Sequence, residues 1–300
     1  MKIVVSVAEA RAVCDAARQH GQTLGLVPTM GSFHAGHRSL MRAARAECDV
    51  VVVTLFVNPT QFSPGEDLGA YPRDLDGDAD VAREEHVDFL FAPSVAEMYP
   101  EPGHTTVHVE GLTSGLCGRS RPEHFDGVTT VVAKLFSIAG PCRAYFGRKD
   151  AQQLAVIQQM ARDLNLPVTV VGCPLVREPD GLAMSSRNAY LIQDERRAAT
   201  ALSRSLERAC AAVVAGERDA GVIRAIVLDT IRTEPMLVVE YAEVVHGGSL
   251  EPVTGVDGSV LVALAVKVGR TRLIDNVTIA VDGDEVTFDV GTSAGSLGCS

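Results

Sequence analysis

The sequence predicts an α/β protein in which a doubly wound, Rossmann-like parallel sheet is followed by a smaller α+β domain. In the first part of the chain, strand-like and helix-like segments alternate, as they do in parallel sheets covered by helices. After Pro174 the order changes, because helix-like segments come first and strand-like segments follow them. We therefore expect a first domain over residues 1–175, a second over 176–284 and a flexible tail over 285–300.

The elements of the first domain follow from apolar periodicity and turn residues. The continuous β-branched run in DVVVVTLFVNP is typical of a strand that is buried on both faces of a sheet. In chain order we expect helices over Val7–His20, Gly36–Glu47, Leu75–Glu85, Gly127–Ala139 and Asp150–Leu164, and strands over Gly25–Pro28, Val50–Val57, Val87–Ala92, Arg143–Phe146 and Val168–Cys173.

The second domain is predicted from a helical stretch rich in Ala, Leu and Arg over Asp194–Ala215 and from a second helix over Gly221–Thr233. Three strands are expected after them, over Met236–His246, Val260–Val268 and Arg272–Ala280, joined by turns that contain glycine. The final stretch, GTSAGSLGCS, is small and polar, which is why we expect a tail there.

The composition is that of a globular protein, since 46% of the residues are apolar and 22% are charged. The formal net charge of −11 argues against a general attraction to nucleic acid or to an anionic membrane, but leaves room for a local basic pocket that binds an acidic small molecule. The apolar runs are of strand length, too short to span a bilayer, and the N-terminal run is too short for a signal peptide. We expect no membrane and no nucleic-acid partner.

The seven cysteines are scattered and form no CxxC pair, unlike the usual zinc sites. Nor does the sequence contain a compact cluster of His, Cys and carboxylate residues for zinc. This cysteine usage is typical of reduced, mostly buried thiols, and it predicts a cytoplasmic protein.

The segment VPTMGSFHAGH, residues 27–37, joins a strand to a helix, where doubly wound sheets bind their ligands. His34 and His37 are three residues apart and project from one face of the first helical turn. Gly36 between them allows a ligand to approach the backbone, and the amide groups of a helix N-terminus favour anions. The pattern indicates two side chains aimed at an anion; the alternative is a pair of ordinary turn histidines.

Three further loops carry polar side chains in similar places. FVNPTQF, residues 56–62, follows the buried strand; turn chemistry explains its Asn-Pro pair, whereas Gln61 could bind a hydroxyl or a carboxylate. YPRD, residues 71–74, is a weak signal, for which a helix entry is a sufficient explanation. SRPEHFDG, residues 120–127, places Arg121 and His124 in a loop that either contacts an anion or is an exposed turn.

Two segments near the domain junction suit phosphate. In FGRKDAQQL, residues 146–154, Asp150 and Gln153 resemble a capping box, whereas Lys149 adds a positive charge just ahead of a helix N-terminus. In REPDGLAMSSRN, residues 177–188, Ser185, Ser186 and Arg187 offer two hydroxyls and a guanidinium on one loop, which could instead be a solvated linker.

The sequence contains neither GxxxxGK[ST] nor GxGxxG, which disfavours a P-loop kinase and an ordinary dinucleotide enzyme. The histidines, the lysine and the Ser-Ser-Arg loop suit instead a nucleoside triphosphate whose α-phosphate is attacked and whose pyrophosphate leaves. Such catalysis needs positioning and charge stabilisation more than a covalent nucleophile.

Taken together, these segments closely resemble the pantothenate synthetase (pantoate–β-alanine ligase) family of the HIGH-motif nucleotidyltransferase superfamily. The resemblance is carried by PTMGSFHAGH, FVNPTQF, YPRD, RPEHFDGV, FGRKDAQQL, VREPDGLAMSSRN and RLIDN, in the family's order, from about Val27 to Asn276. HxGH alone would suggest only the superfamily; FVNPTQF together with DGLAMSSRN is highly specific.

The resemblance implies a two-step ligase. The carboxylate of (R)-pantoate attacks the α-phosphate of Mg-ATP to give pantoyl adenylate and pyrophosphate, and the β-alanine amine then displaces AMP. No tightly bound organic cofactor and no dedicated metal site are implied, since Mg²⁺ enters with ATP. The family is usually a homodimer in which the second domain acts as a lid.

The resemblance also implies roles for individual residues. His34 and His37 stabilise the departing pyrophosphate, and His37 also donates a proton. Lys149, Ser185, Ser186 and Arg187 act on the phosphates, and Val176 contacts adenine through its backbone. The residues implied to bind ATP are Met30, Gly31, His34, His37, Gly147, Arg148, Lys149, Asp150, Val176, Met184, Ser185, Ser186 and Arg187. Those implied to bind pantoate or β-alanine are Gln61, Gln153, Asn58, Tyr71, Arg121 and His124.

Four positions depart from the family's usual pattern without removing a residue assigned to chemistry. Arg148 stands where Glu is usual, Ala151 where an aromatic residue is usual, Cys142 where Asp is typical and Glu123 where Gly is frequent. Two other functions therefore stay open beside the ligase. One is a superfamily transferase that moves a nucleotidyl group onto a phosphorylated acceptor, and the other is a non-catalytic nucleotide-binding protein.

Overall fold

Two large sheets and one short pair of strands organise the chain, of which the computed structural model describes residues 1–100 and 103–294. The chain divides into two units, which are described separately. Unit 1 comprises Met1–Glu110, Arg121–Arg148 and Val156–Cys173, and unit 2 comprises Gly111–Ser120, Lys149–Ala155 and the chain from Pro174 onward. The sequence predicted one boundary after residue 175, whereas here two short upstream segments also belong to the second unit.

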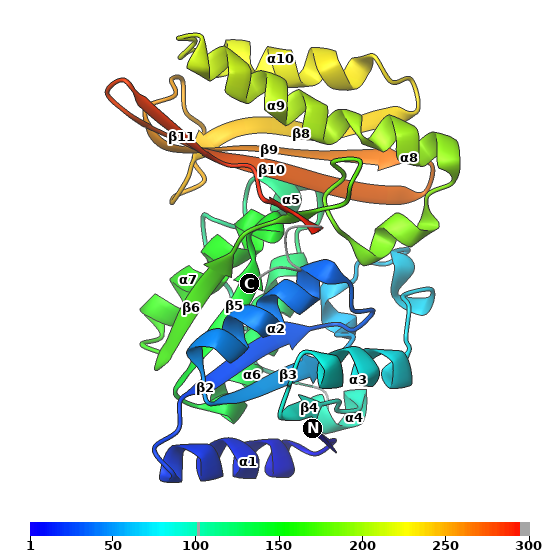
Figure 1. The fold of residues 1–300 in the computed structure, drawn as a ribbon, viewed down its shortest axis with the longest axis vertical. Coiled ribbons are helices and arrows are strands. Elements are labelled where there is room, and N and C mark those ends of the chain that lie inside the picture. Colours follow the sequence, from blue (N-terminus) through cyan, green and yellow to red (C-terminus); the bar gives the residue numbers. More distant parts are fainter. Residues whose placement is uncertain (101–102, 295–300) are drawn as a thin grey trace. The chain divides into compact units, whose positions relative to one another are not determined.

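Unit 1 is built on a six-stranded sheet in the order β1-β4-β3-β2-β5-β6, and every pair of neighbouring strands is parallel (Figure 1). This confirms the predicted α/β class. The strands are β1 (Lys2–Val4), β2 (Leu24–Thr29), β3 (Val50–Leu55), β4 (Phe89–Phe91), β5 (Cys142–Gly147) and β6 (Val168–Cys173).

Helices connect these strands, as the alternating pattern predicted. The main ones are α1 (Val7–Gln19), α2 (Ala35–Glu47), α3 (Leu75–Glu84), α6 (His124–Ala139) and α7 (Ala151–Asp163), with the short α4 (Val95–Met98) after β4. Val51 and Val53 of β3 pack with Leu40, Met41 and Ala44 of α2 and with Ala79 and Ala82 of α3. Since Val50 and Val52 are buried as well, β3 is covered on both faces, as its continuous β-branched run indicated.

Unit 2 is built on an antiparallel sheet in the order β11-β10-β9-β8. Its strands are β8 (Leu237–His246), β9 (Gly258–Val268), β10 (Thr271–Asp282) and β11 (Glu285–Asp289). Figure 1 shows α9 (Ala201–Val214) and α10 (Ala220–Arg232) lying over this sheet, and their apolar side chains form one core with it. Short strands β7 (Val176–Arg177) and β12 (Thr292–Ser293) pair in parallel. Helix α5 (Leu116–Ser120) packs on the other face, around Ala263 and Val245.

Several local expectations differ from the structure. Helix α6 begins at His124 and not at Gly127, so His124 lies in the first turn of a helix and not in the predicted loop. The helix predicted over Asp194–Ala215 is two helices, α8 (Gln193–Ala199) and α9. The break falls at Thr200, whose main-chain N–H and hydroxyl both donate to the Arg197 carbonyl. A Thr hydroxyl that competes for a helical carbonyl in this way ends the regular pattern.

The other two differences lie at a helix start and at the chain's end. Helix α7 begins at Ala151, after a 3-10 turn over Arg148–Asp150, and not at Asp150. Residues 285–293, predicted as part of a flexible tail, include strands β11 and β12, which pair with β10 and β7. The rest of the predicted tail, residues 295–300, lies outside the described residues.

Within residues 1–100 and 103–294, none of the helices combines the length and apolar character that crossing a membrane requires. The six cysteines in the same part of the chain are unpaired thiols, and five of them are buried.

Candidate functional site

Three neighbouring strands of unit 1 end in segments that the sequence singled out. Strands β3, β2 and β5 are adjacent and parallel, so their carboxyl ends lie at one edge of the sheet. Strand β2 leads into Met30–His37, β3 leads into the turn Pro59–Gln61, and β5 leads into Gly147 and Arg148. The strand order also changes direction between β2 and β5, which is where open α/β sheets bind ligands.

The two histidines begin helix α2 and are fixed by its N-terminus. His34 is the N-cap residue, and its Nδ1 accepts the Gly36 main-chain N–H at 3.1 Å. His37 Nδ1 accepts the His34 main-chain N–H at 3.4 Å, and the two ring centroids are 4.2 Å apart. Because a main-chain amide can only donate, each neutral ring carries its proton on Nε2. Each ring is therefore an Nε2–H donor at the positive end of a helix dipole.

A carboxylate that the sequence reasoning missed holds the turn before His34. Asp78 of α3 is 4% exposed and accepts the Ser32 and Phe33 amides at 2.8 and 2.6 Å. Ser32 has a φ of +56°, and Gly31 has a φ of +87°. A Cβ on Gly31 would lie 2.8 Å from Asp78 Oδ2, so the turn requires glycine there. Burial raises the pKa of Asp78, and the two amide hydrogen bonds oppose that rise.

The only sign of Asp78 in the sequence is an acidic residue at a core-facing position of the helix that YPRD begins. The YPRD segment leads into α3, which is the helix entry that the sequence suggested. Asp74 caps α3 by accepting the Gly77 amide at 3.0 Å. Tyr71 is buried and packs edge-on against Phe62, with ring centroids 5.8 Å apart.

Gln61 is oriented by a buried asparagine. Asn58 Nδ2 donates to Gln61 Oε1 and to the Gly127 carbonyl, both at 3.1 Å, so both of its amide hydrogens are used. Its Oδ1 accepts the hydroxyls of Tyr99 and Thr60. Asn58 is 1% exposed, and in this structure it supports Gln61; its contact with the substrate stays a prediction.

The other end of the Gln61 amide is the end suited to a ligand. Its Nε2 donates to Met30 Sδ at 3.0 Å, and a thioether is a weak acceptor. An oxygen of a carboxylate or hydroxyl would bind this N–H more strongly. Gln61 and Met30 come from the ends of neighbouring strands, so this contact joins two of the predicted segments.

Arg121 and His124 also act on this turn. Arg121 forms an ion pair with both oxygens of Glu66, each at 2.6 Å, and donates to the Gln61 carbonyl at 3.1 Å. His124 Nδ1 lies 2.7 Å from the same carbonyl, which can only accept, so the ring donates there. Burial raises the pKa of Glu66, but the Arg121 guanidinium outweighs it and the pKa is lowered. In this structure both residues position the Gln61 backbone.

The predicted phosphate-binding residues of the later segments belong to unit 2. Lys149 is half-buried, and its main-chain carbonyl accepts a hydrogen bond of 2.8 Å from Asn276 Nδ2 of β10. Ser185 caps the 3-10 turn Ser186–Tyr190 through its hydroxyl, which accepts the Arg187 amide at 3.3 Å. The Met184 amide donates to the Val176 carbonyl at 2.9 Å, so the predicted adenine and phosphate segments are joined.

Helix α7 begins with two glutamines that have different surroundings. Gln152 is buried, accepts the Cys117 amide and donates to the carbonyls of Leu112 and Gly115. It therefore fixes the segment Gly111–Ser120 of unit 2. Gln153, the predicted pantoate ligand, is half-buried.

The four departures from the family pattern lie in different surroundings. Arg148 is exposed and its Nε donates to the Gly172 carbonyl of β6 at 3.1 Å, while Ala151 packs against an apolar cluster of unit 2 that includes Tyr241. Cys142 is a half-buried thiol at the start of β5, and Glu123 is the exposed N-cap residue of α6.

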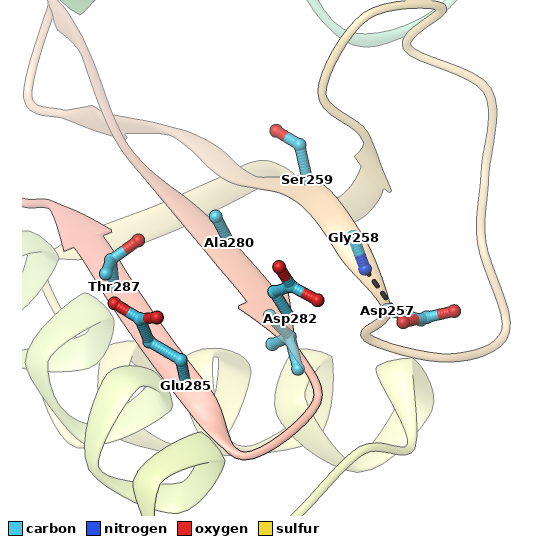
Figure 2. Close-up of a pocket in the computed structure, with 8 residues that line it drawn as sticks. Asp257, Gly258, Ser259, Ala280, Asp282, Glu285 and Thr287 are labelled. Carbon is cyan, nitrogen blue, oxygen red and sulfur yellow. Dashed lines mark hydrogen bonds between the residues drawn. The ribbon is translucent and has the colours of Figure 1, made fainter.

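A hollow of about 540 Å³ at the end of β10 contains none of the predicted residues (Figure 2). Asp257, Asp282 and Glu285 contribute carboxylates to its lining, and no Lys, Arg or His lines it. Like charges would repel a polyphosphate there. Within the described residues, no three His, Cys, Asp or Glu side chains gather closely enough to hold a metal ion.

The sequence profile of the family described as pantoate-beta-alanine ligase matches residues 2–278. The chain belongs to this family. A pantothenate synthetase from Heliobacterium modesticaldum is 55% identical over 281 residues, which cover 94% of this chain and all of that protein. A pantothenate synthetase from Acetivibrio thermocellus is 53% identical over the same length and coverage.

Solved structures of the ligase family share the fold. The crystal structure of pantothenate synthetase from Thermus thermophilus matches with a TM-score of 0.87 and 45% identity, covering 92% of this chain and 98% of that one. A pantoate-beta-alanine ligase from Francisella tularensis, complexed with beta-gamma ATP and β-alanine, matches with a TM-score of 0.75 and 31% identity, covering 92% and 97%. These matches confirm the ligase-family resemblance predicted from the motifs.

Proposed function

We propose that the protein condenses (R)-pantoate with β-alanine to pantothenate at the expense of ATP, with AMP and pyrophosphate as the other products. In the first step a pantoate carboxylate oxygen bonds to the α-phosphorus of ATP, and the bond to pyrophosphate breaks. In the second, the β-alanine nitrogen bonds to the carbonyl carbon of pantoyl adenylate, AMP leaves and the nitrogen loses a proton. The end-to-end family match carries this proposal.

His34 and His37 serve the first step as hydrogen-bond donors. Their Nδ1 atoms accept main-chain amides, so the Nε2–H groups are what each ring offers to the β- and γ-phosphates of ATP. Charge that builds up on departing pyrophosphate is stabilised by such pre-positioned donors and by the N-terminus of α2. His37 also acts as the proton donor.

Gln61 binds pantoate through Nε2, which exchanges Met30 Sδ for an oxygen of the substrate. Its side chain is already oriented by Asn58 and its main chain by Arg121 and His124, so little conformational entropy is lost on binding. Gln153 is the second pantoate ligand, and Gln61 also helps to place β-alanine.

Lys149, Ser185, Ser186 and Arg187 bind the ATP phosphates, with Gly147, Arg148 and Asp150 beside them. Val176 contacts the adenine through its backbone, and Met184 binds the nucleotide beside Ser185. The Lys149 ammonium and the Arg187 guanidinium supply positive charge where the α-phosphate becomes five-coordinate. Mg²⁺ enters with ATP, since phosphate oxygens are its preferred ligands.

The protein is proposed to work in the cytoplasm as a homodimer, with unit 2 acting as a lid. The family resemblance supports the last two parts of this proposal, because the family is usually a homodimer in which the second domain acts as a lid.

The test is to measure AMP and pyrophosphate formation from Mg-ATP with pantoate alone and then with β-alanine added. We expect pyrophosphate release that requires pantoate, and steady AMP turnover only when both acids are present. ATP binding without turnover would favour the non-catalytic nucleotide-binding alternative. Turnover that requires a phosphorylated acceptor in place of pantoate would favour a different superfamily transferase.

A further inference from the structure

The RLIDN segment of β10, residues 272–276, is part of the family pattern but has no assigned role. Its last two residues are buried polar residues of unit 2: Asp275 is 1% exposed and Asn276 is 6% exposed. Burying polar groups costs free energy unless their hydrogen bonds are made, so their partners show what the burial maintains.

Asn276 holds the backbone of the predicted phosphate-binding lysine. Its Nδ2 donates to the Lys149 main-chain carbonyl at 2.8 Å, across 127 residues of sequence. Lys149 lies in the 3-10 turn Arg148–Asp150, directly ahead of α7, where no regular strand or helix fixes its direction. A hydrogen bond to its carbonyl constrains the peptide plane next to the Cα from which the ammonium group extends.

Asp275 holds the segment that carries Val176. It accepts two hydrogen bonds from the Arg177 guanidinium, at 2.8 and 3.1 Å. A third, at 2.8 Å, comes from the main-chain N–H of Asn276. Arg177 also donates to the carbonyls of Gly181 and Val290. Burial raises the pKa of Asp275, and the positive charges of Arg177 and Lys149 oppose that rise.

Two successive residues of one strand thus fix two separate segments. Successive strand side chains point to opposite faces of a sheet, which lets Asp275 reach Arg177 while Asn276 reaches Lys149. Their partners on β9 confirm the alternation, since Asp275 pairs with Leu264 of the core under the helices and Asn276 pairs with Ala263 on the other face.

We propose that Asn276 is a positioning residue for the first step of the reaction, acting through Lys149, with the Asp275–Arg177 pair fixing the adenine-binding segment in register with it. This inference rests on the proposed function, because it assigns the hydrogen bond to the placement of an ATP-binding lysine. The Asn276 amide does not touch the substrate; it determines where the Lys149 ammonium lies.

The test is a double-mutant cycle between Asn276→Ala and Lys149→Ala, with Val277→Ala as the matched control. Val277 is the next residue of β10, is fully buried under the helices and lies outside every predicted substrate contact. The readouts are thermal unfolding, the Kd for Mg-ATP by calorimetry and pantoate-dependent pyrophosphate release.

In the wild-type background we expect Asn276→Ala to weaken Mg-ATP binding and kcat/KM for ATP by roughly five- to tenfold, the range of one hydrogen bond. In the Lys149→Ala background the same change should cost less than about twofold, because the group it positions is gone. Asn276→Asp, which keeps the volume but places a carboxylate oxygen against the Lys149 carbonyl, should reproduce the loss even if the alanine variant folds poorly. Val277→Ala should lower the melting temperature and leave ATP binding unchanged.

Equal losses in the two backgrounds would overturn the proposal, and so would a melting-temperature loss with unchanged ATP binding in both Asn276 variants. A failure of the proposed function looks different, since the wild type would then show no pantoate-dependent pyrophosphate release. If the wild type is active but the losses from the Asn276 and Lys149 substitutions are additive, only the role of Asn276 is contradicted.

Discussion

Removing the Asp78 carboxylate should disable the histidine turn with only a moderate loss of stability. Asp78 is 4% exposed and accepts the Ser32 and Phe33 amides at 2.8 and 2.6 Å, directly before His34. In Asp78→Ala both amides lose their acceptor. The turn, which holds Ser32 at a φ of +56°, then loses the contact that offsets its backbone strain.

The loss of stability expected in Asp78→Ala follows from these contacts. Two hydrogen bonds to an ionised acceptor contribute about 3–6 kcal/mol in total, and left-handed backbone at Ser32 costs about 1 kcal/mol. The cost of burying the Asp78 charge, visible in its raised pKa, offsets part of this gain. We therefore expect the free energy of unfolding to fall by about 2–4 kcal/mol.

The effect on catalysis should exceed the effect on stability. A displacement of about 1 Å in a positioned group can cost roughly 100-fold in rate, so kcat for pantoate-dependent pyrophosphate release should fall on the order of 100-fold. The assay is pyrophosphate release with saturating Mg-ATP and pantoate, together with urea unfolding of each variant.

Asp76→Ala is the matched control, since Asp76 is an exposed acidic residue in the first turn of the same helix. It should change stability by less than about 0.5 kcal/mol and leave the rate near that of the wild type. An Asp78→Ala enzyme that releases pyrophosphate within twofold of the wild-type rate would refute the reasoning, because the histidines would then be placed without the carboxylate.

Three further predictions follow from the same geometry. His34→Asn keeps an acceptor at the N-cap and should unfold like the wild type, whereas His34→Ala should lose about 1 kcal/mol of unfolding free energy. Both variants should release pyrophosphate at least about 10-fold more slowly than the wild type. A wild-type rate in His34→Asn would rule out the Nε2–H role. Gln61→Ala should raise KM for pantoate by about 10-fold but KM for ATP by less than twofold, and an equal effect on both substrates would reject the assignment. Because Arg121 lowers the pKa of Glu66, this pair stabilises the fold above the usual pKa of a glutamate, near 4.5, and the contribution is lost as pH falls through the lower folded-state value. Glu66→Gln should therefore flatten the acid limb of a stability–pH curve, and an unchanged limb would show that the pair contributes nothing.

The sequence by itself determined the fold class, the family and the identity of most candidate residues. The periodicity of apolar residues and the local composition are properties of short segments. The β-branched run of β3 and the strand-to-helix change at His34 could therefore be predicted without a structure. The motif order from Val27 to Asn276 determined the ligase family in the same way, and the family profile over residues 2–278 agrees.

Only the tertiary structure decided which residues support which. Asn58, Arg121 and His124, for which substrate binding was predicted, also form hydrogen bonds with the turn that carries Gln61, and nothing in the sequence indicated these contacts. No role was predicted for Asp78 or for Asn276, yet each fixes the backbone of a segment that carries a predicted catalytic residue.

The physical reason is the length of chain between hydrogen-bond partners. Asp78 contacts a turn 45 residues away, and Asn276 contacts a carbonyl 127 residues away. No local pattern encodes such pairings, because they arise only when the strands and helices pack and buried polar groups must find partners. Side chains predicted to bind a substrate lie in recognisable local motifs. The side chains that position them can be identified only from the tertiary structure.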